Sequence, residues 1–174
     1  MIARRVLLIG MMGSGKTSVG REIQARTGWP YVDNDDAVLR DTGLPTRALH
    51  EQRGTHALRA AESHVMHAAL VAPPPYVAGI AAGVVESPED VAALTAADAF
   101  VVYLHTPLDV LIRRVGSGVG RPWLQPDPAT ALRVLSQGRE PLYREVADLV
   151  VDTSVGDAAS HADQVVAALT ALDG

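Results

Sequence analysis

A phosphate-binding pattern begins ten residues into the chain, where the sequence reads Gly10-Met11-Met12-Gly13-Ser14-Gly15-Lys16-Thr17. The spacing matches G-x-x-x-x-G-K-[ST], with a strand-like run before it and a helix-like run after it. Glycines let the backbone curl so that successive N–H groups point inward, and the start of a helix adds its positive end. Lys16 would reach the phosphates, and the Thr17 hydroxyl would ligate Mg²⁺. The alternative is an ordinary glycine-rich turn with a surface lysine.

The lysine of this pattern stands out in the composition. Lys16 is the one lysine among 15 basic residues, so the other 14 are arginines. An ammonium group is a compact point charge with three donors, whereas a guanidinium is a broad planar fork. A tight anion pocket accounts for a lysine where the rest of the chain uses arginine.

An acidic segment, residues 33–36, is the second group that could do chemistry. Asp33 and Asp35 follow a strand-like stretch, and we expect them to share one face of an extended segment. The carboxyl ends of parallel strands are where such sheets bind ligands. One carboxylate could hold Mg²⁺ through water while the other meets a substrate hydroxyl. The alternative is an acidic turn that caps the next helix.

Three arginines could bind anions, and each has a simpler interpretation. Arg59 precedes Glu62 at an i,i+3 spacing, which is also typical of a surface salt bridge. Arg121 follows a glycine-rich run and could cover a γ-phosphate, or it could be a loop charge. Arg139 could clamp an anionic substrate, or it could cap the end of a helix.

Strand-like and helix-like stretches alternate about five times and must position these residues. Strands are expected over residues 5–9, 29–32, 76–80, 100–104 and 149–151. Helices are expected over residues 17–27, 45–53, 55–71, 107–114, 128–145 (broken near Pro141) and 158–172, and after Ser87. Residues 116–120 are too rich in glycine for either element and are expected to form a mobile loop. The alternation predicts a three-layer α/β/α fold with a five-stranded parallel sheet.

The composition fits one domain over residues 1–174 and excludes several classes of protein. Apolar residues make up 48% of the chain and the net charge is −5, which argues against disorder and against a dedicated nucleic-acid binder. No apolar run reaches the roughly 18 residues of a membrane span, and the N-terminal stretch reads as a strand rather than a signal peptide. The absence of cysteine excludes disulfides and zinc–thiolate sites and favours a reducing cytoplasm.

The order of the motifs resembles that of the shikimate kinases, which are small P-loop kinases of the nucleoside-monophosphate-kinase type. The resemblance runs from about Val6 to Thr153. Beyond the phosphate loop it rests on six segments: Asp33-Asn34-Asp35 for D-x-D, Leu58-Arg59-Ala60-Ala61-Glu62 for F-R-x-x-E, Val101-Val102-Tyr103-Leu104 for V-V-x-L, Arg121-Pro122-Trp123-Leu124 for the R-P-L-L of the lid, Arg139-Glu140-Pro141-Leu142-Tyr143 for R-x-P-L-Y, and Ala147-Asp148 to Asp152-Thr153 for the closing A-D…V-D-T.

The resemblance implies an enzyme that transfers the γ-phosphate of ATP to a hydroxyl of shikimate or a similar small carboxylated polyol, in aromatic amino acid biosynthesis. It implies a mobile lid over about residues 113–125, acceptor-binding helices over about residues 35–71, and a monomer. The implied catalytic residues are Lys16, Asp35 and Arg121. The implied nucleotide contacts are Gly13, Ser14, Gly15, Lys16, Thr17, Ser18, Arg114 and Arg121, with Thr17 and Asp33 on Mg²⁺. The implied acceptor contacts are Asp35, Arg59, Ala82, Gly83 and Arg139.

The acceptor half departs from the family pattern, whereas the ATP half keeps it. Ala81 and Ala82 stand where the family has glycines beside the substrate ring; each adds a methyl group and restricts positive φ. His50 and Leu58 stand where the family has aromatic residues, and Thr55 stands where it has glutamate. Two alternatives therefore stay open: a kinase of another small metabolite such as a cyclitol or sugar acid, and a catalytically inactive nucleotide-binding regulatory module.

Overall fold

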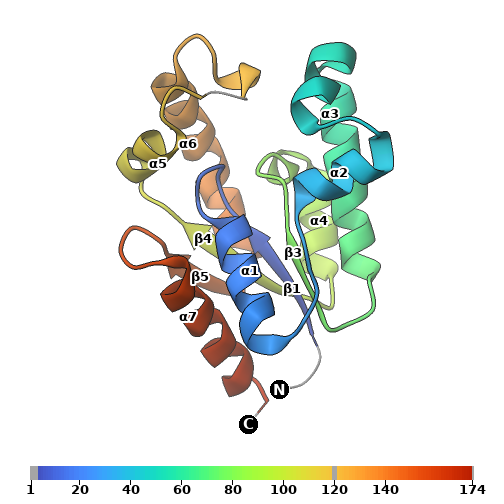
Figure 1. Cartoon of the computed structure of the whole chain (residues 1–174), viewed down its shortest axis with the longest axis vertical. Helices are drawn as coiled ribbons and strands as arrows, with labels where there is room; N and C mark the ends of the chain where they lie inside the picture. The colour runs from blue at the N-terminus through green and yellow to red at the C-terminus, as the bar shows by residue number, and fades with distance from the viewer. Residues whose placement is uncertain (1–3, 119–120, 174) are drawn as a thin grey trace.

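A five-stranded parallel sheet forms the centre of the molecule (Figure 1). The structure is a computed structural model that describes residues 4–118 and 121–173. The strand order is β2-β3-β1-β4-β5, so the strand that precedes the phosphate loop is central. The strands are β1 (Arg5–Ile9), β2 (Tyr31–Val32), β3 (Tyr76–Gly79), β4 (Phe100–His105) and β5 (Leu149–Asp152). The predicted five-stranded parallel sheet is confirmed.

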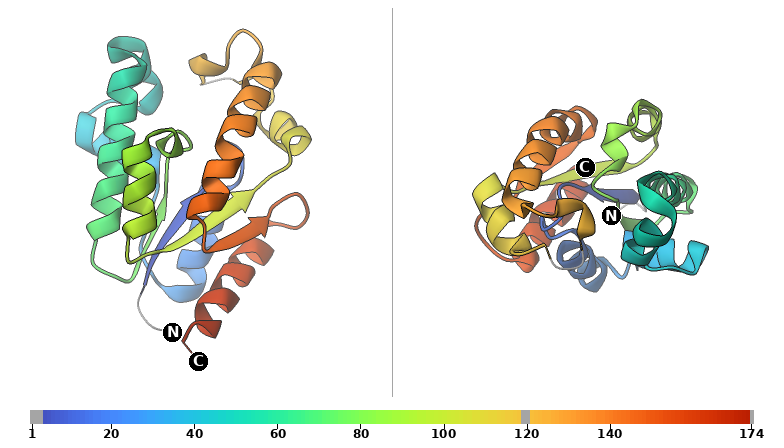
Figure 2. Two further views of the ribbon diagram at one scale, coloured as in Figure 1. Left: turned by 180° about the vertical axis from the view of Figure 1, so that it is seen from behind. Right: turned by 90° about the horizontal axis from the view of Figure 1, so that it is seen from above.

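Helices cover both faces of this sheet, which confirms the three-layer α/β/α fold. Figures 1 and 2 show α1 and α7 on one face and α3, α4 and α6 on the other. The helices of the described residues are α1 (Lys16–Thr27), α2 (Asn34–Thr42), α3 (Thr46–Val71), α4 (Pro88–Ala96), α5 (Leu108–Val115), α6 (Pro128–Val146) and α7 (Ala158–Ala171), with the short 3-10 turns η1 (Val84–Glu86) and η2 (Pro122–Leu124).

The central strand β1 shows why these layers form. Its side chains alternate, so that Val6 and Leu8 pack with α1 and α7, while Leu7 and Ile9 pack with helices of the opposite face. All four are at most 1% exposed. A strand buried on both faces has to be apolar throughout, and this is the continuous apolar run visible in the sequence.

Helix α6 and strand β2 differ from the expected elements, whereas the interruption of helix α3 agrees with them. Helix α6 continues through Pro141 to Val146 instead of breaking, because Pro141 is exposed while Arg139 and Tyr143 anchor the helix in the core on either side. Strand β2 begins at Tyr31 rather than at residue 29. Helix α3 is interrupted at Gly54 (φ 82°, ψ 174°), which matches the two helices expected on either side of this residue.

The carboxyl ends and the amino ends of the strands lie at opposite edges of the sheet, and different groups lie at each. The phosphate loop, the start of α2 and the end of β3 lie at the upper edge in Figure 1, where the strands reach their carboxyl ends. The first and last described residues meet at the opposite edge, where Arg4 Nη2 donates to Asp173 Oδ1 at 3.1 Å. Within the described residues no helix combines the length and the apolar character needed to cross a membrane.

Candidate active site

The phosphate loop folds as its glycines require. Gly10 has φ +139°, and a Cβ there would lie 2.7 Å from the carbonyl oxygen of Leu104 on the neighbouring strand. Gly15 is the N-cap of α1 and has φ 98°. At both positions the positive φ disfavours any residue other than glycine. At Gly10 there is also no room for a Cβ atom. The loop therefore places the amino end of α1 at the carboxyl edge of the sheet.

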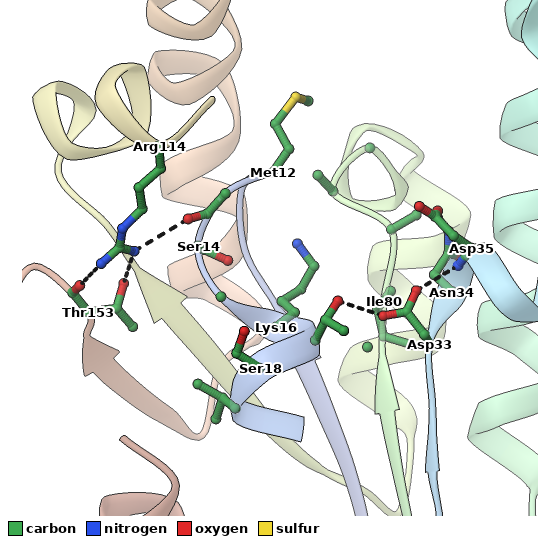
Figure 3. Close-up of a pocket in the computed structure, with 18 of the residues that line it drawn as sticks. Met12, Ser14, Lys16, Ser18, Asp33, Asn34, Asp35, Ile80, Arg114 and Thr153 are labelled. Carbon is green, nitrogen blue, oxygen red and sulfur yellow. Dashed lines mark hydrogen bonds between the residues drawn. The ribbon is translucent and has the colours of Figure 1, made fainter. Parts of the chain in front are cut away.

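Lys16 lies in the middle of this edge. Figure 3 shows its side chain between Arg114 on one side and Asp33 and Asp35 on the other. Its Nζ donates to the carbonyl oxygen of Gly10 at 2.8 Å and to that of Met11 at 3.1 Å. An ammonium has three donors, so a third is available for a phosphate oxygen. Burial lowers the pKa of Lys16 to about 8, although the two aspartates oppose this shift.

For the nucleotide contact predicted for Lys16, this pKa implies a dependence of binding on pH. Phosphate favours the ammonium form, so above about pH 8 the free protein must take up a proton when the nucleotide binds. We expect the affinity for ADP, measured without divalent cations, to fall as the pH rises through this value. Calorimetry in buffers of different ionisation enthalpy should show an uptake approaching about one proton near pH 9 and little near pH 7. Lys16→Arg, which stays protonated, should show no uptake; uptake that persists in this variant would assign the proton to another group.

Asp33 is fixed by three donors. Its Oδ2 accepts hydrogen bonds from Thr17 Oγ1 at 2.6 Å and Tyr31 OH at 3.0 Å, and its Oδ1 accepts from the backbone N–H of Asp35 at 3.0 Å. The expectation that Asp33 and Asp35 share an extended segment is wrong. Asp33 is the N-cap of α2 and Asp35 lies in its first turn, because the chain turns into a helix immediately after β2. The capping interpretation of this segment is therefore correct for Asp33, which also faces Thr17.

Tyr31 is a site residue that the sequence reasoning missed. Its ring fills the space above Gly20 of α1, where a Cβ would come within 2.2 Å of the ring. Its hydroxyl lies against Gly79 of β3, where a Cβ would come within 2.6 Å of the oxygen. Burial raises the pKa of this hydroxyl, so it stays a hydrogen-bond donor to Asp33 at neutral pH. A glycine inside a helix was the available signal, because it marks a close approach.

Asp35 borders the cavity on the side opposite Arg114 (Figure 3). It accepts a hydrogen bond from Asn34 Nδ2 at 3.2 Å. Burial of its carboxyl group raises its pKa, while Lys16 and Arg121 oppose the shift. A carboxylate with a raised pKa is a stronger proton acceptor, which suits a general base.

Arg59 projects from α3 onto the segment after β3. Its guanidinium packs on Gly83, where a Cβ would lie 2.4 Å from Cζ, and its Nη1 donates to Glu62. Burial raises the pKa of Glu62, an effect that Arg59 partly offsets. The salt bridge expected as the simpler interpretation thus exists, and it holds Arg59 at the cavity wall rather than on an outer face.

Arg139 is buried in the middle of α6, so its interpretation as a helix cap is wrong. Its side chain is 2% exposed, and its Nε donates to Glu86 Oε1 at 2.9 Å. Its Nη1 is buried and has no hydrogen-bond partner among the described residues. A buried charged donor without a partner is costly, which indicates a place for an anionic ligand. The sequence reasoning missed Glu86, which lies 53 residues away in the chain.

The segment after β3 keeps a regular backbone despite its alanines. No non-glycine residue of the described chain has a positive φ, so the restriction expected for Ala81 and Ala82 has no effect. The carbonyl oxygen of Ala82 accepts a hydrogen bond from Tyr143 OH at 2.6 Å. Tyr143 thereby ties this segment to α6, four residues beyond Arg139.

Two further arginines complete the cavity. Arg114 donates through Nη1 to the carbonyl oxygen of Gly13 at 3.3 Å and through Nη2 to that of Thr153 at 2.6 Å. Arg121 lines the same cavity, which has a volume of about 690 Å³. Residues 119–120 of the expected mobile loop lie outside the described residues. Every residue predicted for the nucleotide, the acceptor or the metal lines this one cavity.

Comparison with known proteins identifies the family. The family model of shikimate kinase matches residues 12–170. The chain belongs to the shikimate kinase family. The shikimate kinase of Halorhodospira halophila is 39% identical over 166 residues, which cover 95% of this chain and 93% of that protein. The solved structure of shikimate kinase from Acinetobacter baumannii in complex with shikimate superimposes with a TM-score of 0.90 at 30% identity, over 97% of this chain and 93% of that chain.

More distant structures share the fold of the shikimate kinase family. Deoxyadenosine kinase from M. mycoides has a TM-score of 0.64 at 14% identity, over 95% of this chain and 98% of that chain, which shows the fold alone. As a member of the shikimate kinase family, the chain is an ATP-dependent small-molecule kinase. The P-loop kinase fold and the kinase activity expected from the motifs are confirmed at this level.

Proposed function

We propose that this protein transfers the γ-phosphate of ATP to a hydroxyl group of shikimate. The buried Nη1 of Arg139, which has no partner among the described residues, carries the proposal. It lies in the same cavity as the phosphate loop and Asp35. An acceptor that reaches both needs a carboxylate for Arg139 and a hydroxyl for Asp35, and shikimate has both groups.

The acceptor carboxylate is assigned to the two guanidinium groups of Arg59 and Arg139. Both line the cavity that also contains Lys16, and a guanidinium can bind a carboxylate through two parallel hydrogen bonds. Ala82 and Gly83 form the adjoining wall. This arrangement fixes the acceptor ring so that one hydroxyl faces Asp35.

The transfer step depends on the orientation of the acceptor hydroxyl and on positive charge near the phosphoryl oxygens. Asp35 orients the acceptor hydroxyl and accepts its proton as the oxygen attacks the γ-phosphorus, while the bond from the γ-phosphorus to the bridging oxygen breaks and ADP leaves. Lys16 and Arg121 stabilise the negative charge on the phosphoryl oxygens, and such positioning and electrostatic stabilisation dominate this type of catalysis. The remaining contacts to the nucleotide are assigned to Gly13, Ser14, Gly15, Ser18 and Arg114.

Thr17 and Asp33 are assigned to Mg²⁺. A hydroxyl and a carboxylate lie 2.6 Å apart at the amino end of α1, and hard oxygen donors of this kind fit Mg²⁺, with water completing its shell. When bound, the ion neutralises charge on the β- and γ-phosphates. Tyr31 keeps the carboxylate of Asp33 directed at the site through its hydrogen bond.

The proposal extends to the organisation of the protein. Residues 1–174 act as a single domain in which about residues 113–125 form a lid and about residues 35–71 form the acceptor-binding part. The protein works as a monomer in the cytoplasm. Its place among cellular reactions is aromatic amino acid biosynthesis.

Release of ADP from MgATP, measured with and without shikimate in a coupled assay, tests the proposal. We expect stimulation by shikimate that saturates. Background release only, with ADP binding intact by calorimetry, would overturn it. The same assay over cyclitols and sugar acids then tests the second candidate, which the methyl groups of Ala81 and Ala82 on the cavity wall favour.

Replacement of Arg139 tests the carboxylate assignment. Arg139→Lys keeps a positive charge beside Glu86 but cannot pair through two parallel N–H groups. We expect KM for shikimate to rise about 10- to 100-fold, because a hydrogen bond to a charged group contributes about 1.5–3 kcal/mol. KM for ATP should change by less than about twofold. For a neutral methyl ester of shikimate, the same substitution should raise KM much less than it does for the acid. Equal increases in KM for the ester and the acid would contradict the assignment.

A further inference from the structure

Trp123 occupies an unusual position in the cavity. It belongs to η2, which lies at the top of Figure 1 beside the upper part of α3. Its side chain packs against the core cluster under α3, α4 and α6, and also against the separate cluster between α2 and α3. It also lines the cavity that holds Arg59 and Arg139. One indole therefore connects the segment of Arg121 with the acceptor-binding helices.

Four departures from the family pattern lie close together here. Trp123 replaces a leucine of R-P-L-L, and its ring contacts His50 edge-to-face, with centroids 5.5 Å apart and an interplanar angle of 69°. His50 replaces an aromatic residue of the family, and its Nε2 lies 3.1 Å from Oγ1 of Thr55, which replaces a glutamate. The second lost aromatic position, Leu58, is 2% exposed and lies in the cluster that Trp123 covers.

We propose that Trp123 supplies the apolar wall of the acceptor pocket in this protein and determines its specificity for a ring-shaped acceptor. Relative to the family pattern, α3 lacks two aromatic side chains, whereas η2 carries one that lines the cavity, contacts His50 and packs on the cluster that contains Leu58. An indole presents a large, rigid apolar face at a small cost in conformational entropy. Such a face suits the C–H groups of a carbocycle, whereas Arg59 and Arg139 suit its carboxylate. The inference rests on the proposed function and adds a specificity residue to it.

Intrinsic fluorescence tests the contact directly. The chain has two tryptophans, and Trp29 lies in the core beneath α1, away from the cavity. In Trp29→Phe, Trp123 is the single tryptophan, and shikimate added to the ADP complex should change its emission with a saturable dependence. Saturating shikimate that supports turnover but leaves the emission unchanged would overturn the proposal.

Kinetics of a matched set of variants tests the role in specificity. Trp123→Leu restores the family residue and should raise KM for shikimate about tenfold while KM for ATP stays within about twofold. Trp123→Phe keeps an aromatic face and should lie close to the wild type. His50→Phe in the Trp123→Leu background should recover most of the lost affinity, because it returns an aromatic ring to the helix.

The outcomes separate this proposal from the proposed function. An unchanged KM for shikimate in Trp123→Leu would overturn the specificity role while shikimate phosphorylation stands. Failure of His50→Phe to recover any affinity would show that the aromatic wall has not been transferred from the helix to η2, and would overturn the proposal as well. Absence of shikimate-dependent ADP release in the wild type would overturn the proposed function and this inference together.

Discussion

Replacement of Lys16 by alanine is expected to reduce shikimate-dependent turnover by about 10³-fold or more, which corresponds to about 4 kcal/mol of transition-state stabilisation. Lys16 projects from the first residue of α1 into the cavity and is held by two carbonyl oxygens of the phosphate loop. Its removal takes away the cation closest to the loop, and no other lysine exists in the chain. The measurement is kcat and kcat/KM in the coupled ADP-release assay.

Two controls make the Lys16 result specific. Arg133→Ala removes a positive charge from an exposed position of α6 and should leave turnover within about twofold. Lys16→Arg keeps the charge but brings a planar fork into a pocket fitted to a point charge, so it should also lose most of its activity. Near wild-type activity in Lys16→Arg would contradict the explanation of the lone lysine, and full activity in Lys16→Ala would refute the role of the phosphate loop.

Replacement of Asp35 by asparagine should lower kcat about 10²- to 10⁴-fold, because a general base contributes about this much. The amide keeps the size of the side chain and its position in the first turn of α2, but it does not accept a proton. KM for ATP and the affinity for ADP should be unchanged, since Asp33 and Thr17 are untouched.

A neighbouring carboxylate provides the control for Asp35. Asp36 is exposed in the same turn of α2, so Asp36→Asn changes the charge equally and should leave kcat within about twofold. Because burial raises the pKa of Asp35, the wild-type rate should fall at a higher pH on the acid side than an ordinary aspartate would allow. In Asp35→Asn this fall in rate at acid pH should disappear. If the fall persists in Asp35→Asn, the titrating group is another residue.

Short-range patterns in the sequence predict most of the fold. Residues 5–9 are apolar at every position because β1 is buried on both faces, and this can be recognised without any knowledge of its neighbours. The phosphate loop can also be recognised locally. Gly15 caps the helix that it precedes, and Lys16 donates to the carbonyl oxygen of Gly10 six residues earlier. Pro141 shows the limit, because the burial of Tyr143 keeps α6 intact where the local rule predicts a break.

The parts of the site that sequence reasoning missed depend on contacts between distant segments. Glu86 pairs with Arg139 across 53 residues, and Trp123 contacts His50 across 73 residues of sequence. Tyr31 reaches Asp33 only because Gly20 and Gly79, on two different elements, leave room for its ring. No short motif encodes such a pair. The position of Asp35 was misjudged for a related reason, since β2 ends one residue before the helix cap.

The ion pair between Arg4 and Asp173 has a practical consequence for handling the protein. It joins the first and last described residues of the chain at the edge of the sheet opposite the active site. A surface tether or fusion partner attached to either end would leave the cavity open to solution. A short linker between the two ends would close the chain into a ring, and new ends could then be opened in an exposed loop such as the one between α3 and β3.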